Sequence, residues 1–131
     1  MKVIYRFVVL LVAASVMFSF ADPAAFGTDE GKAVTLSSDP RLNPAKESFE
    51  RGEHFMEKGN IEFRRRPGLA QKMFEHAEDY YAKASFMYRE EGEKLGIDTS
   101  HEVAECERMN RKAHVWVNKS RRQRKRTGAG I

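Results

Sequence analysis

Residues 69–95, LAQKMFEHAEDYYAKASFMYREEGEKL, decide the fold of this chain. Small residues recur every seven positions in this stretch, and so do two sets of larger side chains. The three series are Ala70, Ala77 and Ala84; Phe74, Tyr81 and Tyr88; and Met73, Tyr80 and Met87. Seven residues make about two helical turns, so the stretch predicts one long helix with a wide apolar face. A face that wide needs two neighbours, and we expect this helix to lie between two others.

A second period-seven pattern precedes this stretch and predicts a first helix over residues 44–63. Asn43-Pro44 offers a start, because Asn can cap free backbone donors and Pro suits the first helical position. Small and large residues alternate along one face: Ala45, Gly52 and Gly59, with Phe49, Met56 and Phe63 between them. The two glycines either permit a close approach of a neighbouring helix, or Gly59-Asn60 ends the helix. Pro67-Gly68 predicts the turn into the second helix.

The end of the long helix and the start of a third carry stop and start signals. Gly96 suits the left-handed conformation that ends many helices, and Ile97 can fold back on the last turn. Thr99 and Glu102 have the spacing of a capping box, in which each side chain satisfies a backbone donor near the other. The third helix follows, with an apolar stripe formed by Val103, Cys106, Met109, Ala113, Trp116 and Val117.

These elements predict an all-α fold: a three-helix unit built on an antiparallel αα-hairpin. Residues 22–42 are rich in Gly, Ser, Thr, Asp and Pro without apolar periodicity, and we expect a flexible leader there. The predicted organisation is therefore a leader over 22–42, a helical domain over 43–118 and a basic C-terminal tail over 119–131. Residues 1–21 form a separate apolar segment.

The hairpin resembles the tetratricopeptide repeat, a helix-turn-helix unit that stacks into protein-binding surfaces. Gly52 and Phe55 have the spacing of the family's first-helix Gly and Tyr, and Ala70, Phe74 and Ala77 that of its second-helix Ala, aromatic and Ala. The resemblance covers residues 48–82. Ser48 stands where the family has Trp, the connecting segment is longer, and the closing Pro is missing. The alternative is a small bundle in which any helical hairpin packs small residues against large ones.

Residues 1–21 read as a cleavable secretory signal. Lys2 and Arg6 provide a positive start, residues 7–20 are uncharged and mostly apolar, and Ser19 and Ala21 are small residues at cleavage positions. The alternative is an uncleaved membrane anchor, but a span needs about 20 apolar residues. We therefore expect export to a periplasmic or extracellular location, with the mature chain starting at Asp22.

The charge is divided unevenly along the predicted mature chain. Six positive residues fall within residues 119–126, and residues 22–118 carry 15 basic and 19 acidic side chains. The six candidate polyanion-binding residues are Lys119, Arg121, Arg122, Arg124, Lys125 and Arg126. Such a segment attracts an anionic envelope polymer, a lipid surface or an acidic protein, and nucleic acid is an improbable ligand for a secreted protein. The alternative is a solvated, frayed helix end that only keeps the protein soluble.

Catalytic and cofactor signatures are missing from the sequence. His101 and Glu102 begin a segment close to the zinc-protease pattern, but Glu105 replaces the second histidine. No phosphate-binding loop, heme-attachment motif or nucleophile motif is present, so we expect no enzyme activity, no metal, no cofactor and no small-molecule substrate. The lone Cys106 is either buried on the apolar stripe or paired with a second chain.

The function expected from these features is that of an exported, non-enzymatic helical protein that binds another protein, as an adaptor, scaffold or accessory subunit of an envelope complex, or that self-associates. Large apolar residues beyond what one neighbouring helix covers are the candidate partner-binding set. They are Tyr80, Tyr81, Phe86, Met87, Tyr88 and Trp116. The alternative is a polyanion- or membrane-surface-binding module that acts through the basic tail.

Overall fold

The computed structural model describes residues 35–128, which contain a short 3₁₀ turn, η1 (Pro40–Leu42), and three long helices, α3 (Asn43–Glu62), α4 (Pro67–Leu95) and α5 (Ser100–Arg126). The all-α prediction is confirmed for this part of the chain. None of these described helices is long and apolar enough to cross a membrane. The predicted signal segment, and the alternative of an anchor, lie outside the described residues.

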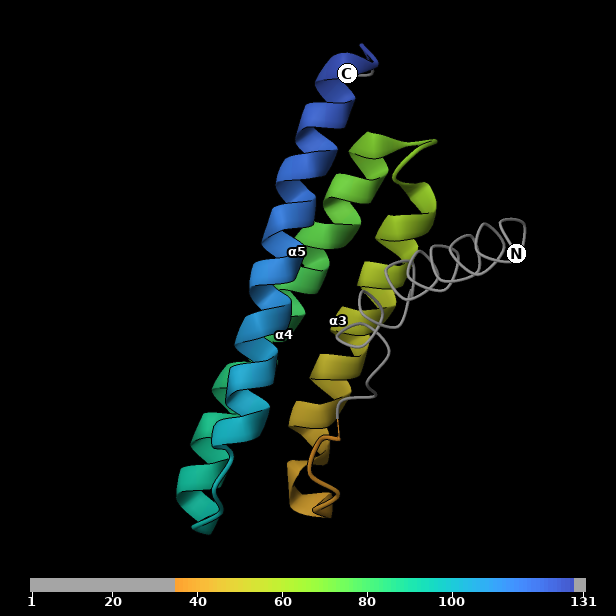
Figure 1. Ribbon diagram of the computed structural model, residues 1–131. Coiled ribbons are helices and arrows are strands. Elements are labelled where there is room, and N and C mark those ends of the chain that lie inside the picture. Colours follow the sequence, from red (N-terminus) through yellow and green to blue (C-terminus); the bar gives the residue numbers. More distant parts are fainter. Residues whose placement is uncertain (1–34, 129–131) are drawn as a thin grey trace, which may run out of the picture. The chain divides into compact units, whose positions relative to one another are not determined.

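α4 lies between the other two helices and runs antiparallel to both (Figure 1). This confirms the central position predicted from its wide apolar face. The three alanines of its period-seven series, Ala70, Ala77 and Ala84, are fully buried, and so are its three aromatic residues Phe74, Tyr81 and Tyr88. The core is therefore a continuous layer on both sides of α4.

Two glycines of α3 pack directly against aromatic rings of α4. A Cβ built on Gly52 would lie 2.7 Å from Tyr81 Cε1, and one built on Gly59 would lie 2.6 Å from Phe74 Cε1. Both distances are shorter than a carbon contact allows, so the two helices approach this closely only because these residues lack a side chain. α3 continues past Gly59 to Glu62, so the alternative that Gly59-Asn60 ends the helix is wrong.

The turn between α3 and α4 lies earlier in the chain than predicted. Pro67 is the first residue of α4, and Gly68 lies in its first turn, so Pro67-Gly68 is not the turn itself. Pro lacks a backbone N–H and its φ suits the first helical turn, where that donor has no helical acceptor. Asn43 likewise lies inside α3, whose cap position is occupied by Leu42.

The connection between α4 and α5 is held by hydrogen bonds that only partly follow the prediction. Gly96 takes the left-handed conformation at φ 65°, and the Ile97 N–H donates to the Gly92 carbonyl at 2.9 Å, as expected for a Schellman ending. The capping box is wrong. The buried Thr99 hydroxyl donates to the Tyr88 carbonyl at 2.9 Å, and Glu102 accepts from the Ser37 N–H at 3.1 Å.

The predicted leader over 22–42 has a defined end. Asp39 accepts a hydrogen bond from the Arg41 N–H and begins η1, and Leu42 is fully buried. The expectation of no fixed structure is therefore wrong for residues 40–42, because one leucine side chain reaches the core and the bond between Ser37 and Glu102 fixes the preceding residues. Residues 22–34 lie outside the described part of the chain.

Most of the segment predicted as a basic tail, residues 119–126, belongs to the third helix. α5 continues without interruption to Arg126. Ser120 is fully buried within the segment that the sequence assigned to the tail. The basic residues are therefore held on a folded helix, which fixes where their side chains can lie.

Candidate functional site

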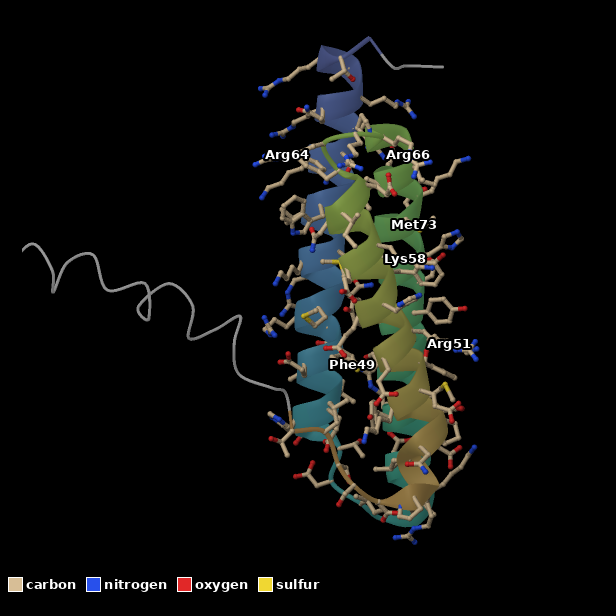
Figure 2. The ribbon with its side chains drawn as sticks, turned by 90° about the vertical axis from the view of Figure 1, so that its right-hand side faces the viewer. Phe49, Arg51, Lys58, Arg64, Arg66 and Met73 are labelled. Atoms are coloured by element: carbon tan, nitrogen blue, oxygen red, sulfur yellow. The ribbon has the colours of Figure 1, made fainter. Side chains whose placement is uncertain are left out.

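Two basic segments that are far apart in the sequence meet at one end of the helical unit. Residues 64–66, all arginines, form the turn between α3 and α4, and residues 119–126 form the last turns of α5. Figure 2 shows Arg64 and Arg66 at the end where the C-terminal turns of α5 also lie. We call the nine Lys and Arg side chains of these two segments the basic end.

Trp116 links the two segments. Its ring meets the Phe63 ring edge-on at a centroid distance of 5.3 Å and stacks on the Phe74 ring at 5.5 Å. The Lys119 Nζ lies 4.3 Å from the centre of the same indole ring, a cation–π contact. Because Phe63 directly precedes Arg64, this cluster places the basic turn of α5 beside the arginines of the α3–α4 turn.

Arg124 makes a second link, at the first turn of α4. Its Cδ lies 3.6 Å from where a Cβ of Gly68 would be, so the aliphatic part of the arginine covers this glycine. Arg124 Nε and Ser120 Oγ are buried, and neither has a hydrogen-bond partner among the described residues. A buried guanidinium donor without an acceptor costs free energy.

The basic end contains little negative charge to neutralise it. Glu62 accepts two hydrogen bonds from Arg66, at 2.7 and 2.8 Å, and this arginine lowers the pKa of the carboxyl. Arg64 and Arg65 are exposed on the same turn. From Arg108 to the end of the chain the sequence contains no Asp or Glu. The end therefore has a strong positive potential, which attracts anions.

Positive residues also run along the exposed side of α5, and the sequence interpretation missed this. Arg108, Arg111, Val115, Lys119, Arg122 and Arg126 are all exposed. Their spacings of three and four residues place them on one face of the helix, which we call the α5 ridge. Helical spacing of the basic residues was the signal that could have found it, but the sequence interpretation considered only the basic residues of α5 from 119 on.

The candidate partner-binding set does not form one surface. Tyr81 and Tyr88 are fully buried against the other helices, so these two candidates are wrong as exposed docking residues. A wide apolar stripe in the sequence does not show which of its residues the neighbouring helices bury. In this fold α3 and α5 bury Phe74, Tyr81 and Tyr88. Trp116 is half-buried in the aromatic cluster of the basic end.

The three remaining candidates lie in two separate hollows. Tyr80 and Met87 line a hollow of about 200 Å³ between α3 and α4, together with Arg51 and Lys83. Phe86 lines a hollow of about 310 Å³ between α4 and α5. Phe86 is 60% exposed, which makes it the main apolar feature of the second hollow.

Cys106 and the histidines do not assemble into a reactive or metal-binding site in the described residues. Cys106 is fully buried, which confirms the first of the two interpretations, and burial raises the pKa of its thiol to about 12. His114 lies at the surface with its Nδ1 2.9 Å from Glu78 Oε1. Within residues 35–128, no three His, Cys, Asp or Glu side chains are grouped as metal ligands.

Comparison of this chain with protein-family models, with curated proteins and with solved structures found no match. The resemblance to the tetratricopeptide repeat stays a prediction from residue spacing. The two helices of the hairpin contain 20 and 29 residues, which is together more than the whole repeat unit of about 34 residues.

Proposed function

We propose that this protein binds a polyanion through its basic end. The observation that carries the proposal is the meeting of residues 64–66 with residues 119–126 at one end of a folded helical unit, held there by the contacts of Trp116 and Arg124. The sequence features that predict export make an anionic polymer or lipid surface outside the cytoplasm the expected ligand.

Folding adds affinity that a flexible basic tail would lack. Side chains that are already positioned lose less conformational entropy on binding, and a cluster of like charges gains more than isolated charges do when an anion neutralises it. The aliphatic stem of Arg124 packs on α4 and the Lys119 ammonium lies over an indole ring, so both charges are partly fixed before a ligand arrives.

The test is a titration of the protein with a soluble polyanion, such as long-chain polyphosphate, at several salt concentrations. We expect the logarithm of the affinity to fall linearly with the logarithm of the salt concentration. The variant Arg64→Gln/Arg121→Gln removes one exposed charge from each segment and should weaken binding by about tenfold and reduce the slope. The matched control, Lys72→Gln/Lys83→Gln, removes two exposed charges from α4 and should bind as the wild type does.

An affinity that is independent of salt, or a loss of affinity as large in the control as in the variant, would contradict the proposal. The first outcome would mean that charge does not drive binding. The second would mean that the total charge, rather than the basic end, attracts the polyanion.

Binding of another protein is the second candidate function, and Phe86 is the observation in its favour. An aromatic side chain that is 60% exposed, in a hollow shared by two helices, suits an apolar side chain of a partner. The variant Phe86→Ser should then release a partner retained from the native host while leaving polyanion binding unchanged. Retention of the same partner by the variant would rule out this surface.

A further inference from the structure

We infer that the ligand of the basic end is a flexible, linear, phosphate-bearing chain that lies along the α5 ridge and bends over the end of the helical unit toward Arg64 and Arg65. This inference rests on the proposed function and extends it, because it specifies the face of α5 that the ligand contacts, the orientation of the ligand and its shape.

The α5 ridge is long enough to bind an extended ligand along its length, and we call it a track for that reason. From Arg108 to Arg126 it covers 18 residue steps, which is about 27 Å of helix at 1.5 Å per residue. Five of its six members are Arg or Lys, so a positive group follows about every 5 Å except at Val115. A chain with regularly spaced anionic groups can contact several of these residues at once.

The carboxylates of α5 lie near the N-terminal part of the track, because the sequence contains no Asp or Glu after Glu107. Glu105 accepts hydrogen bonds from Arg108, and Glu107 lines the same hollow as Arg111. The ridge therefore becomes more positive toward the C-terminal end of α5, where Lys119, Arg122 and Arg126 adjoin the α3–α4 turn. A bound chain is held most tightly at that end.

A flat membrane fits this distribution of charge less well than a chain does. The ridge lies along the side of α5, and Arg64 lies in the α3–α4 turn at the end of the helical unit (Figure 2). A flat surface that contacts the side of α5 along its length does not also contact the α3–α4 turn at the end of the unit. A flexible chain can contact both. Interfacial helices also bury a broad apolar face in the lipid, and the ridge contains only one apolar residue, Val115.

Arginine predominates over lysine in this surface, and this favours phosphate as the anionic group. The exposed arginines of the ridge and the basic end outnumber the exposed lysines, which are Lys119 and Lys125. The arginines are Arg64, Arg65, Arg66, Arg108, Arg111, Arg121, Arg122 and Arg126. The planar guanidinium matches two phosphate oxygens at once, whereas the lysine ammonium acts as a single compact charge.

The experiment measures the affinity of the full-length protein for polyphosphate chains of increasing defined length at one salt concentration. We expect affinity to rise with length until the chain covers about 27 Å of α5 and the adjoining end, and then to change little. The variant Arg111→Gln removes a ridge charge outside the basic end, so it should weaken binding of long chains by several-fold and leave binding of the shortest chains, which occupy the basic end, nearly unchanged. Lys83→Gln is the charge-matched control.

The possible failures of the two proposals differ in this experiment. If no chain length binds, the proposed function itself is wrong. If all lengths bind equally and the ridge variant binds as the wild type does, the basic end binds anions but the track along α5 is wrong. Stronger binding to vesicles containing anionic lipid than to long polyphosphate, or to sulfated oligosaccharides of equal length, would overturn the choice of a phosphate chain.

Discussion

At the residue scale, Gly52 and Gly59 are the positions where the contact between α3 and α4 tolerates least change. Alanine is the better helix former by about 1 kcal/mol, so each substitution by Ala would stabilise an isolated helix. Here the added methyl group would collide with a fully buried ring, at 2.7 Å for Gly52 and 2.6 Å for Gly59. Close packing therefore decides the sign of the effect.

We predict that Gly52→Ala and Gly59→Ala each lower the free energy of unfolding by about 1 kcal/mol or more, because overpacking costs about 1–3 kcal/mol and exceeds the gain in helix propensity. Thermal or urea denaturation followed by circular dichroism measures this. Gly68→Ala is the control, since its methyl group would meet only the flexible Arg124 side chain at 3.6 Å. A control that destabilises as much as the other two would contradict the packing explanation.

One buried thiol and two buried tyrosine hydroxyls make the free energy of unfolding depend on pH in the alkaline range. Burial raises the pKa of the Cys106 thiol to about 12, and it also raises the pKa of the Tyr81 and Tyr88 hydroxyls above the ordinary tyrosine value. Between pH 9 and pH 12 the unfolded chain therefore binds fewer protons than the folded chain. The free energy of unfolding must fall as pH rises through this range.

We predict that this loss begins near pH 9, where an unfolded thiol ionises, and steepens above pH 10, where unfolded tyrosines also ionise. Each group contributes up to about 1.4 kcal/mol per pH unit. Urea denaturation at a series of pH values measures the slope. In Cys106→Ala the part between pH 9 and pH 10 should disappear, and a slope that is unchanged in this variant would show that the thiol is not protected in the folded state.

At the scale of the element, the sequence patterns predicted the helices better than their ends. The period-seven series predicted the start of α4 to within two residues and its end at the observed residue. The prediction is accurate because each buried position in the series independently indicates the same helix. A cap depends on one side chain, which any nearby acceptor can take. Thr99 shows this, since the Tyr88 carbonyl across the turn lies 2.9 Å from its hydroxyl.

The last turns of α5 are the element whose role the sequence obscured. Residues 119–126 contain no apolar side chain, and isolated helices of such composition are marginal. The buried Ser120 and the covering of Gly68 by Arg124 supply tertiary contacts that composition does not reveal. Ser and Arg side chains usually lie at the surface, so a sequence gives no sign that Ser120 and Arg124 make these contacts.

We predict that deleting residues 119–131 lowers the midpoint of thermal unfolding by several degrees, because it removes these contacts together with the cation–π contact of Lys119. Arg121→Gln/Arg122→Gln keeps the backbone and removes only exposed charge, so its midpoint should match that of the wild type. Equal midpoints for the deleted and full-length proteins would show that the end of α5 contributes nothing to the fold.

At the scale of the whole helical unit, the two ends differ in charge. Glu90, Glu91, Glu93 and Asp98 lie where α4 meets α5, and the basic end lies at the other end of the same helices. Arg89 and Lys94 offset part of that negative charge through ion pairs with Glu107 and Glu91. Two copies placed end to end would bring opposite charges together.

We predict weak end-to-end association at low ionic strength that disappears at about 0.3 M salt, where charges are screened beyond a few ångströms. Sedimentation velocity at several protein and salt concentrations measures it. Arg64→Gln/Arg121→Gln should associate less than the wild type does. Association that persists at high salt would instead indicate an apolar contact between copies, for which Phe86 is the first residue to substitute.

The candidate site could be predicted from the sequence only in part. The block over 119–126 is visible as a charge run, and helical spacing could also have drawn attention to Arg108 and Arg111. Its meeting with Arg64 and Arg65 requires the lengths of α3 and α4 and the direction of α5, which no single residue pattern contains. The burial of Tyr81 and Tyr88 required the same information.

The aromatic cluster around Trp116 gives the molecule a built-in optical probe. The chain contains one tryptophan, so its tryptophan emission arises from a single place. The Lys119 ammonium lies 4.3 Å from that indole ring, and a ligand that draws this lysine away changes the field at the fluorophore. The wavelength of tryptophan emission would therefore report binding of the proposed ligand at the basic end without any attached dye.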